Sequence, residues 1–306
     1  MLSSLESGIG LDVVLWLQGQ SNGLFDILAQ VLHLLGLPEF FIPALVLVYW
    51  SLDRRLGIRL LFALAIALLI STGLKEMFQR PRPFSVSDAV VPLVDQAGYG
   101  LPSGHVAIAL AVWGYAVYWY RLWRALVPLG VYVLLVSWSR MYLGVHYPQD
   151  VAVGLVLGGL TLWSYIWLAE HFPTFWKRLA LQPQVALVVL VTLVSFVFLF
   201  QDEAGQALSG VLLGSGLGLI MEGRWINFRA DGTIRQRALR YGAGVALTLL
   251  LFFGLRALFE GLEPQALLRA LRYGLVAWIA TFGWPWLAIR LGWMEQAASR
   301  EIAKTL

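Results

Sequence analysis

The sequence predicts an all-α, polytopic membrane protein, and three observations support this fold class. Hydrophobic side chains make up 59% of the 306 residues, only 13% of the residues are charged, and the mean hydropathy is +0.73. A soluble globular domain carries about 25% charged residues. About ten apolar runs have a length close to what a helix needs to cross a hydrocarbon core of roughly 30 Å. The sequence contains no cysteine, which excludes disulfides, thiolate nucleophiles and cysteine-bound metals.

The predicted crossings follow one another with short connections. They lie near residues 22–36, 38–52, 56–78, 104–121, 124–139, 150–169, 184–200, 206–221, 238–259 and 265–289. Segment 8–20 mixes apolar residues with Asp12, Gln18 and Gln20, which favours a position in the interface before the first crossing. Two longer connections, 79–103 and 222–237, are expected to hold most of the irregular structure.

Basic residues are distributed unequally between alternate loops. One set of loops holds 15 of the 22 Lys and Arg residues, whereas the opposite set holds few and includes acidic turns at 201–203 and 260–263. Because cytoplasmic loops are enriched in Lys and Arg, the second set is predicted to face the outside. We attribute the net charge of +4 to this orientation and to contact with anionic headgroups, not to nucleic-acid binding.

On the predicted outer side, basic residues cluster at 75–82 and at Arg140. The preference of basic residues for cytoplasmic loops does not explain their presence there, so we look for a functional reason. The cluster at 75–82 closes the helix that ends near residue 78, because Pro81 and Pro83 cannot continue it. Lys75 and Arg82 can then point into one cavity.

Two further segments are expected at the same face. Residues 102–105, Pro-Ser-Gly-His, begin a helix, so that Ser103 can cap it and the free N–H groups of the next residues can bind an anion. Residues 139–150 span the end of one helix and the start of another. Pro148 suits the first position of that second helix, and Asp150 lies in its first turn.

These segments contain the residue types that phosphoryl transfer requires. The groups expected to bind the phosphate oxygens belong to Lys75, Arg82, Ser103, Gly104 and Arg140. His146 can attack phosphorus, while His105 protonates the leaving oxygen and later acts as base toward water. Asp150, four residues after His146, can accept a hydrogen bond from one ring nitrogen and leave the other free as the nucleophile.

The three segments resemble the signature of the type 2 phosphatidic acid phosphatase (PAP2) family, written KxxxxxxRP, PSGH and SRxxxxxHxxxD. The sequence matches it at Lys75, Arg82, Pro83, Pro102, Ser103, Gly104, His105, Ser139, Arg140, His146 and Asp150. The resemblance implies a core of six transmembrane helices and a reaction through phosphohistidine that needs no metal or other cofactor. We therefore expect a PAP2-type catalytic core at residues 1–175 and an extension of about four further crossings, without an assigned function, at residues 176–306.

Two classes of function fit these residues. One is hydrolysis of a lipid phosphate or diphosphate, such as phosphatidic acid, phosphatidylglycerophosphate or a polyprenyl diphosphate, at the outer face of a bacterial-type inner membrane; a lipid phosphotransferase would use the same intermediate. The other is a transporter or flippase that uses the site only to recognise its cargo. Paired histidines with an orienting acid favour the enzyme, because recognition needs cations alone. The sequence has no acidic cluster near the site that resembles a Mg²⁺ cage, so we expect activity to persist in EDTA.

Residues outside the signature are expected to have structural roles. His33 and His171 are predicted to be packed or hydrogen-bonded residues, because neither lies in a motif. Arg80 is expected either behind the site or at lipid headgroups, since the spacing selects Arg82 for the phosphate. Small residues every four positions predict close helix packing at Gly154 and Gly158, and at Gly210, Gly214 and Gly218.

Overall fold

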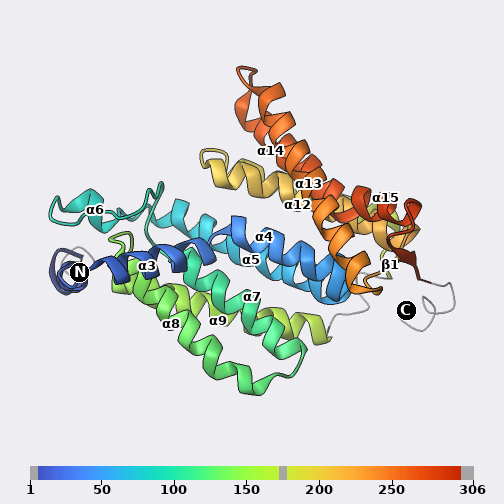
Figure 1. Cartoon of the computed structure of the whole chain (residues 1–306). Helices are drawn as coiled ribbons and strands as arrows, with labels where there is room; N and C mark the ends of the chain where they lie inside the picture. Colours follow the sequence, from blue (N-terminus) through green and yellow to red (C-terminus); the bar gives the residue numbers. More distant parts are fainter. Residues whose placement is uncertain (1–5, 172–177, 298–306) are drawn as a thin grey trace. The chain divides into compact units, whose positions relative to one another are not determined.

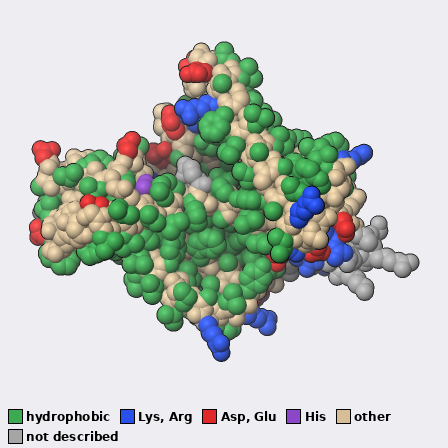
Figure 2. Space-filling model, in the orientation of Figure 1, with side chains coloured by type: hydrophobic (Ala, Val, Ile, Leu, Met, Phe, Trp, Pro, Cys, Tyr) green, Lys and Arg blue, Asp and Glu red, His purple; other side chains and the backbone are tan. Residues whose placement is uncertain are grey.

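The structure, a computed structural model, describes residues 6–171 and 178–297 (Figure 1). Within these ranges the regular structure is helical except for an antiparallel pair of two-residue strands, β1 (Phe228–Arg229) and β2 (Glu295–Gln296). Large hydrophobic side chains are widely exposed; Val127, Val197 and Leu250 are 75%, 74% and 73% exposed. Hydrophobic side chains also cover much of the face shown in Figure 2. Helices with such surfaces suit lipid as their solvent. The prediction of an all-α membrane protein is confirmed.

The chain divides into two compact units. The first contains residues 1–42 and 62–167, and the second contains residues 43–61 and 168–306. Segment 43–61 therefore groups with the C-terminal part of the chain, although it precedes most of the first unit in sequence. The division near residue 175 into a catalytic core and an extension stays a prediction.

The first unit is built from helices that surround the three signature segments. Asn22 begins its first long helix, since its side-chain oxygen accepts hydrogen bonds from the N–H groups of Leu24 and Phe25. The helices of the unit in chain order are η1 (Glu6–Gly10), α2 (Leu11–Gln18), α3 (Gly23–Leu35), part of α4 (Pro38–Leu47), most of α5 (Arg54–Phe78), α6 (Pro83–Val86), α7 (Gly104–Trp119), η3 (Trp123–Ala125), α8 (Leu126–Tyr142) and α9 (Pro148–His171).

A buried apolar cluster holds α3, α7, α8 and α9 together. Its members are Leu32, Val106, Ala109, Val133, Val136 and Val151. Small residues let α9 approach the start of α7 closely: a Cβ on Gly154 would lie 2.7 Å from the carbonyl oxygen of Ser103, and one on Gly158 would lie 2.9 Å from that of Ala107. The predicted close packing at these two glycines is confirmed, and it brings the N-terminal part of α9 beside the start of α7.

The second unit is also helical. Its elements in chain order are the rest of α4, η2 (Val48–Leu52), the start of α5, α11 (Leu181–Phe198), α12 (Glu203–Trp225), β1, α13 (Ile234–Phe259), α14 (Gln265–Trp278), η4 (Ile279–Gly283), α15 (Trp284–Arg290) and β2. Helix α12 packs tightly on α14, because a Cβ on Gly210 or Gly214 would collide with the backbone of Ala270 or Gly274. The glycine repeat in α12 is thus a packing surface, as predicted.

A buried ion pair links the start of α5 to the end of α12 in the second unit. Both oxygens of Glu222 accept hydrogen bonds from the guanidinium of Arg54, and Glu222 is fully buried. The N–H of Phe228 donates to the same carboxylate at 3.1 Å. Connection 222–237 was expected to be irregular, and in the structure it holds the short strand β1 beyond this ion pair.

The number of long crossings is smaller than the ten apolar runs suggest. By length and composition, the described residues hold six candidate spans: Arg54–Val86, Trp123–Tyr142, Pro148–His171, Leu181–Phe198, Glu203–Trp225 and Ile234–Phe259. A seventh results if α3 and the helix after it, bent by 53°, form one span. Pro38 opens that second helix and cannot continue α3. Helix α7 has only 16 residues, which is about 24 Å, and the last apolar run is divided into α14, η4 and α15.

Candidate active site

The first unit brings the three signature segments together at the ends of four helices. The N–H of Ser103, just before α7, donates to the carbonyl oxygen of Asp150 in α9 at 2.9 Å. The N–H of His146 donates to the carbonyl oxygen of Arg140 near the end of α8 at 3.2 Å. The N–H of Gly100 donates to the carbonyl oxygen of Arg80, beyond α5, at 2.8 Å. Backbone bonds therefore fix the relative positions of segments far apart in the sequence.

His146 lies between Asp150 and Arg82. Its Nδ1 is 3.4 Å from Oδ2 of Asp150, and its Nε2 is 3.3 Å from Nη1 of Arg82. The contact with Asp150 is long for a hydrogen bond, yet the backbone N–H of Tyr147 donates to the same carboxylate oxygen at 2.9 Å and holds it in place. The side chains of His146 and Asp150 are both buried. Nε2 is thus the ring nitrogen that faces a guanidinium, where the phosphate is expected.

Burial and positive charge keep the imidazole of His146 neutral. Burial lowers its pKa well below the ordinary value of 6.5, and the nearby charges of Arg82, Arg140 and Lys75 lower the pKa further. A neutral imidazole has a free lone pair, which an attacking nucleophile needs. Lys75 is half-buried in the last turn of α5, near enough for its charge to act on His146.

The guanidinium of Arg82 is held by backbone carbonyl groups. Its Nε, Nη1 and Nη2 donate to the oxygens of Gly98, Val145 and Ala97 at 2.8, 2.9 and 3.0 Å. These carbonyls belong to the loop before α7 and the loop before α9. Arg82 therefore ties two loops together and has a fixed orientation beside His146.

Arg140 is fully buried and is held by side chains. Its Nη1 lies 2.6 Å from Nδ1 of His33 in α3, and its Nη2 donates to Oε1 of Gln96 at 2.8 Å. His33 also stacks on His105, with ring centroids 5.2 Å apart and an interplanar angle of 14°. The sequence predicted a packed or hydrogen-bonded His33, which is confirmed, but it gave His33 no place at this site. The sequence signal that could have indicated a role at the site is that His33 lies on the same helix face as the apolar residues Ala29 and Leu32.

Three buried polar atoms in the site have no hydrogen-bond partner among the described residues: Oγ of Ser103, Nε2 of His105 and Nε of Arg140. Each such atom costs about 1–3 kcal/mol when left unpaired. Atoms that can donate hydrogen bonds to phosphate oxygens, gathered at one place, fit an anionic ligand. The prediction that the Ser103 side chain caps α7 is wrong: Ser103 occupies the N-cap position, but its hydroxyl makes no capping bond.

Glycine is found at two positions beside this site for different reasons. Gly104 begins α7 and is buried, and a Cβ there would meet only the side chain of Ser71, at 3.8 Å. Gly36 follows α3, and a Cβ there would lie 2.5 Å from Cδ2 of His105. Gly36 thus allows the close approach of the His105 ring, whereas a Cβ on Gly104 would meet no such obstacle.

Arg80 lies behind the site, one of the two positions expected for it, and not at the lipid headgroups. It is buried, and its Nη1 donates to Oδ1 of Asp150 at 3.0 Å. Its guanidinium also lies over the ring of Tyr147, 5.0 Å from the centroid. Asp150 therefore contacts His146 with one oxygen and Arg80 with the other. In residues 6–171 and 178–297, no group of three or more His, Asp or Glu side chains is arranged to hold a metal ion.

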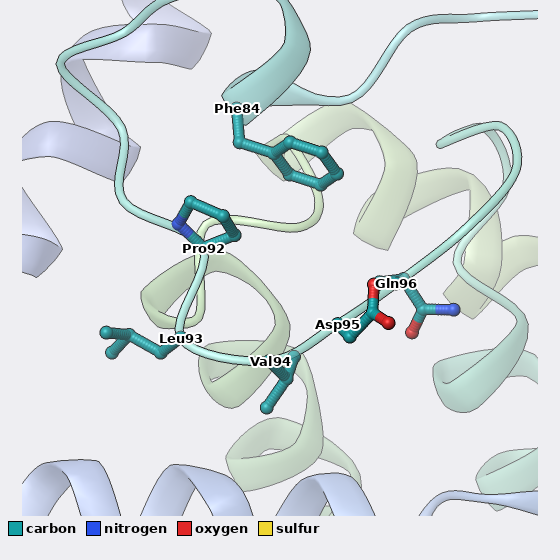
Figure 3. Close-up of a pocket in the computed structure, with 6 residues that line it drawn as sticks. All are labelled: Phe84, Pro92, Leu93, Val94, Asp95 and Gln96. Atoms are coloured by element: carbon teal, nitrogen blue, oxygen red, sulfur yellow. The ribbon is translucent and has the colours of Figure 1, made fainter.

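A cavity of about 370 Å³ has a hydrogen-bond partner of Arg140 in its wall. It is lined by Phe84 from α6 and by residues 92–96 of the loop that follows (Figure 3). Gln96, the last of these residues, is the side chain that accepts a hydrogen bond from Arg140. Gln96 therefore belongs both to the cavity wall and to the immediate surroundings of Arg140.

Comparisons with known proteins agree with this arrangement. Residues 56–174 match the PAP2 superfamily, and residues 206–296 match the transmembrane extension of PAP2 superfamily phosphatases. The chain is 33% identical to a putative undecaprenyl-diphosphatase, YbjG, of Escherichia coli over 134 residues, which are 42% of this chain and 67% of that protein. It is 31% identical to phosphatidylglycerophosphatase B of Bacillus subtilis over 148 residues, 44% of this chain and 69% of that protein.

A eukaryotic relative is more distant. The chain is 27% identical to a probable sphingosine-1-phosphate phosphatase of Dictyostelium discoideum over 173 residues, 52% of this chain and 42% of that protein. The chain thus spans about two thirds of the bacterial relatives and less than half of the eukaryotic one. The signature, its convergence in the first unit and these matches lead to one conclusion: the chain belongs to the PAP2 superfamily of phosphatases, and its C-terminal part corresponds to that superfamily's transmembrane extension.

Proposed function

We propose that this protein hydrolyses the phosphate ester or diphosphate of a membrane lipid through a phosphohistidine at His146. One observation carries the proposal: Nδ1 of His146 faces Asp150 while Nε2 faces Arg82. A site that only recognised phosphate would need the cations but not an oriented neutral imidazole. The family and its relatives, which are lipid phosphatases by name, support hydrolysis of a lipid phosphate.

The proposed site holds the phosphate by its non-bridging oxygens. Arg140 provides a forked donor, Arg82 adds positive charge and its remaining N–H, and Lys75 adds a point charge. The N–H of Gly104 and the hydroxyl of Ser103 complete the contacts. These groups stabilise the charge that develops on the transferring phosphoryl oxygens, and their positions are set before the substrate arrives.

In the first step, Nε2 of His146 attacks phosphorus and the bond between phosphorus and the lipid oxygen breaks. The negative charge of the bound phosphate favours the protonated form of His105. Protonated His105 gives its Nε2 proton to that oxygen, and the lipid alcohol, or lipid monophosphate, leaves. Asp150 stabilises the positive phosphohistidine through Nδ1–H. In the second step, neutral His105 takes a proton from water, the oxygen of that water attacks phosphorus, and the bond to Nε2 breaks. Inorganic phosphate leaves and both histidines return to their initial states.

The proposed location is a bacterial-type inner membrane with the site at its outer face. The excess of Lys and Arg in the opposite loops supports this orientation. The candidate substrates are phosphatidic acid, phosphatidylglycerophosphate and a polyprenyl diphosphate, and the last two are in line with the names of the bacterial relatives. The assignment of residues 1–175 as the catalytic core belongs to the same proposal.

The test is release of inorganic phosphate from these three lipids by the purified protein in detergent, with EDTA present. We expect turnover of at least one lipid by the wild type and by His171→Ala, and none by His146→Ala. A wild-type protein that binds the lipids but releases no phosphate would favour a carrier. Transfer of phosphate to an added lipid alcohol in place of water would identify a phosphotransferase.

A further inference from the structure

The cavity lined by Phe84 and residues 92–96 lies beside the segment that bonds to Arg140 and Arg82. Gln96, in its wall, accepts a hydrogen bond from Arg140 at 2.8 Å. The carbonyl groups of the next two residues, Ala97 and Gly98, accept hydrogen bonds from Arg82 at 3.0 and 2.8 Å. A phosphate held by Arg140 would therefore lie near a residue of the cavity wall, Gln96.

The walls of the cavity are fixed by the surrounding structure. The side chain of Gln18 in α2 donates to the carbonyl oxygen of Val91 at 2.7 Å and accepts from its N–H at 3.2 Å. The N–H of Leu93 donates to the carbonyl oxygen of Leu143 at 3.2 Å. Phe84, Leu93 and Val94 pack against a buried cluster of Leu17, Ala29, Tyr142, Leu143 and Val145. Because the walls are anchored in this way, the cavity is preformed and little ordering is required on binding.

The chemistry of the walls defines what fits. Phe84, Pro92, Leu93 and Val94 offer apolar surface, and Asp95 adds an exposed carboxylate (Figure 3). A short carbon skeleton that carries a hydrogen-bond donor matches both kinds of wall. A second phosphate group does not, because its negative charge would lie near the carboxylate of Asp95.

We propose that this cavity binds the polar backbone next to the phosphoester of a lipid monophosphate, and that Asp95 accepts a hydrogen bond from a hydroxyl or ammonium group there. The proposal rests on the phosphatase function proposed above and narrows its substrate class. Monophosphates with such a donor are preferred over those without one and over polyprenyl diphosphates.

A matched pair of substrates tests the role of the donor. Lysophosphatidic acid has one free hydroxyl next to the phosphoester carbon, and its 2-deoxy analogue lacks only that group. We expect the wild type to favour lysophosphatidic acid in kcat/KM by about tenfold, the usual effect of a hydrogen bond to a charged group. Asp95→Ala should lower kcat/KM for lysophosphatidic acid about tenfold and change that for the analogue less than about twofold. Asp88→Ala is the control, since Asp88 is an exposed carboxylate of the same loop outside the cavity wall.

The ratio of the two kcat/KM values does not depend on the fraction of protein that is folded, so poor folding of Asp95→Ala cannot imitate the result. An equal loss on both substrates, or a wild type that does not distinguish them, would overturn the proposal. Failure of the phosphatase function itself would look different, because the wild type would release phosphate from neither lipid.

The charge of Asp95 is tested with Asp95→Asn, which keeps an acceptor oxygen. We expect this variant to lose more activity on sphingosine 1-phosphate, whose donor includes an ammonium group, than on lysophosphatidic acid. It should gain severalfold on a polyprenyl diphosphate, because a repulsive charge is removed. A wild type that prefers the diphosphate, with no gain in Asp95→Asn, contradicts the proposed substrate class.

Discussion

The imidazole Nδ1 of His33 lies 2.6 Å from Nη1 of Arg140, although the two residues are 107 positions apart. His33 also stacks on His105, so one side chain from α3 supports both a phosphate-binding arginine and the histidine expected to protonate the leaving group. Arg140 is fully buried, and its guanidinium has few other acceptors to orient it. We therefore expect His33 to be a positioning residue for the site.

Replacing His33 tests this relationship. His33→Ala removes the acceptor, and we expect kcat/KM to fall about tenfold because Arg140 loses its orientation. His33→Gln restores an acceptor and should recover much of the loss, whereas His33→Phe keeps a ring but no acceptor and should not. The measurement is phosphate release at several substrate concentrations, with His171→Ala as control. Equal activity of the Phe and Gln variants would show that the ring, not the acceptor, is what the site needs.

Substitution of the proposed nucleophile, His146, is expected to reduce activity more than substitution of Asp150, which orients it. His146→Ala should retain less than about a tenth of the activity, because the covalent step is lost. Asp150→Asn should retain more activity than His146→Ala, because the amide keeps part of the contact that orients the ring. Trapping with ³²P-labelled lipid separates the two, because phosphohistidine is stable in base and loses its label in acid: Asp150→Asn should still form such labelled protein, slowly. Labelled protein from His146→Ala would place the phosphoryl group on another residue.

Arg80 should affect stability more than substrate binding. Arg80→Ala leaves one oxygen of the buried Asp150 without its ion-pair partner, and breaking a buried pair from one side costs about 3–5 kcal/mol. We expect a lower midpoint of thermal unfolding in detergent and a reduced kcat with little change in KM. Arg82→Ala, in contrast, should raise KM because Arg82 is expected to touch the phosphate. A large KM effect in Arg80→Ala would mean that Arg80 also contacts the substrate.

The lowered pKa of His146 predicts the acid side of the pH profile. A free histidine gains a proton near pH 6.5, but in the folded protein His146 stays neutral below that value. The limb of kcat/KM that reports protonation of this residue should therefore lie below pH 6.5. Lys75→Gln removes one of the charges that lower the pKa, so this limb should move to higher pH. A limb that stays in place in Lys75→Gln would show that another group controls it.

The same shift has a consequence for stability. Because the pKa of His146 is lower in the folded protein than in the unfolded chain, the unfolded chain binds the proton first. Stability is unaffected above about pH 6.5 and falls below it, by up to about 1.4 kcal/mol per pH unit for this one group. His146→Gln should flatten this part of the pH dependence, measured as the unfolding midpoint between pH 6.5 and the acid limit of the assay.

Gly36 should matter through His105. Gly36→Ala would place a methyl group 2.5 Å from Cδ2 of His105, so the ring must move. Proton transfer from His105 to the leaving oxygen should become slower, and kcat for a lipid substrate should fall. A substrate such as p-nitrophenyl phosphate, whose leaving group needs no proton, should be affected much less.

Gly130→Ala is the matched control for this experiment, since a Cβ at that position of α8 meets no atom within 4 Å. An equal loss on both substrates in Gly36→Ala would mean that the methyl group disturbs the phosphate site as a whole. A variant with full activity on both would mean that the ring has room to shift without loss of function.

The sequence by itself determined the fold class, the membrane environment and the family, because these depend on local patterns. Apolar runs of helical length, Pro81 and Pro83 after a helix, and Pro148 and Asp150 at the start of another are all read within a few residues. The residues that match the PAP2 signature could be identified from the sequence for the same reason. Even the tight packing of Gly154 and Gly210 followed from spacing alone.

Only the tertiary structure decided which other side chains join the site. His33 carries no motif, and its contact with Arg140 exists because α3 packs on α8. Gln96 looks like an ordinary loop residue until the folded chain places it against Arg140, and only the structure decides between the two positions expected for Arg80 by placing it against Asp150. The number of long crossings also depended on where α3 bends and where the last apolar run divides. Spacing along a chain specifies which residues share a helix face, but contacts between helices depend on side-chain packing among segments that the sequence leaves far apart.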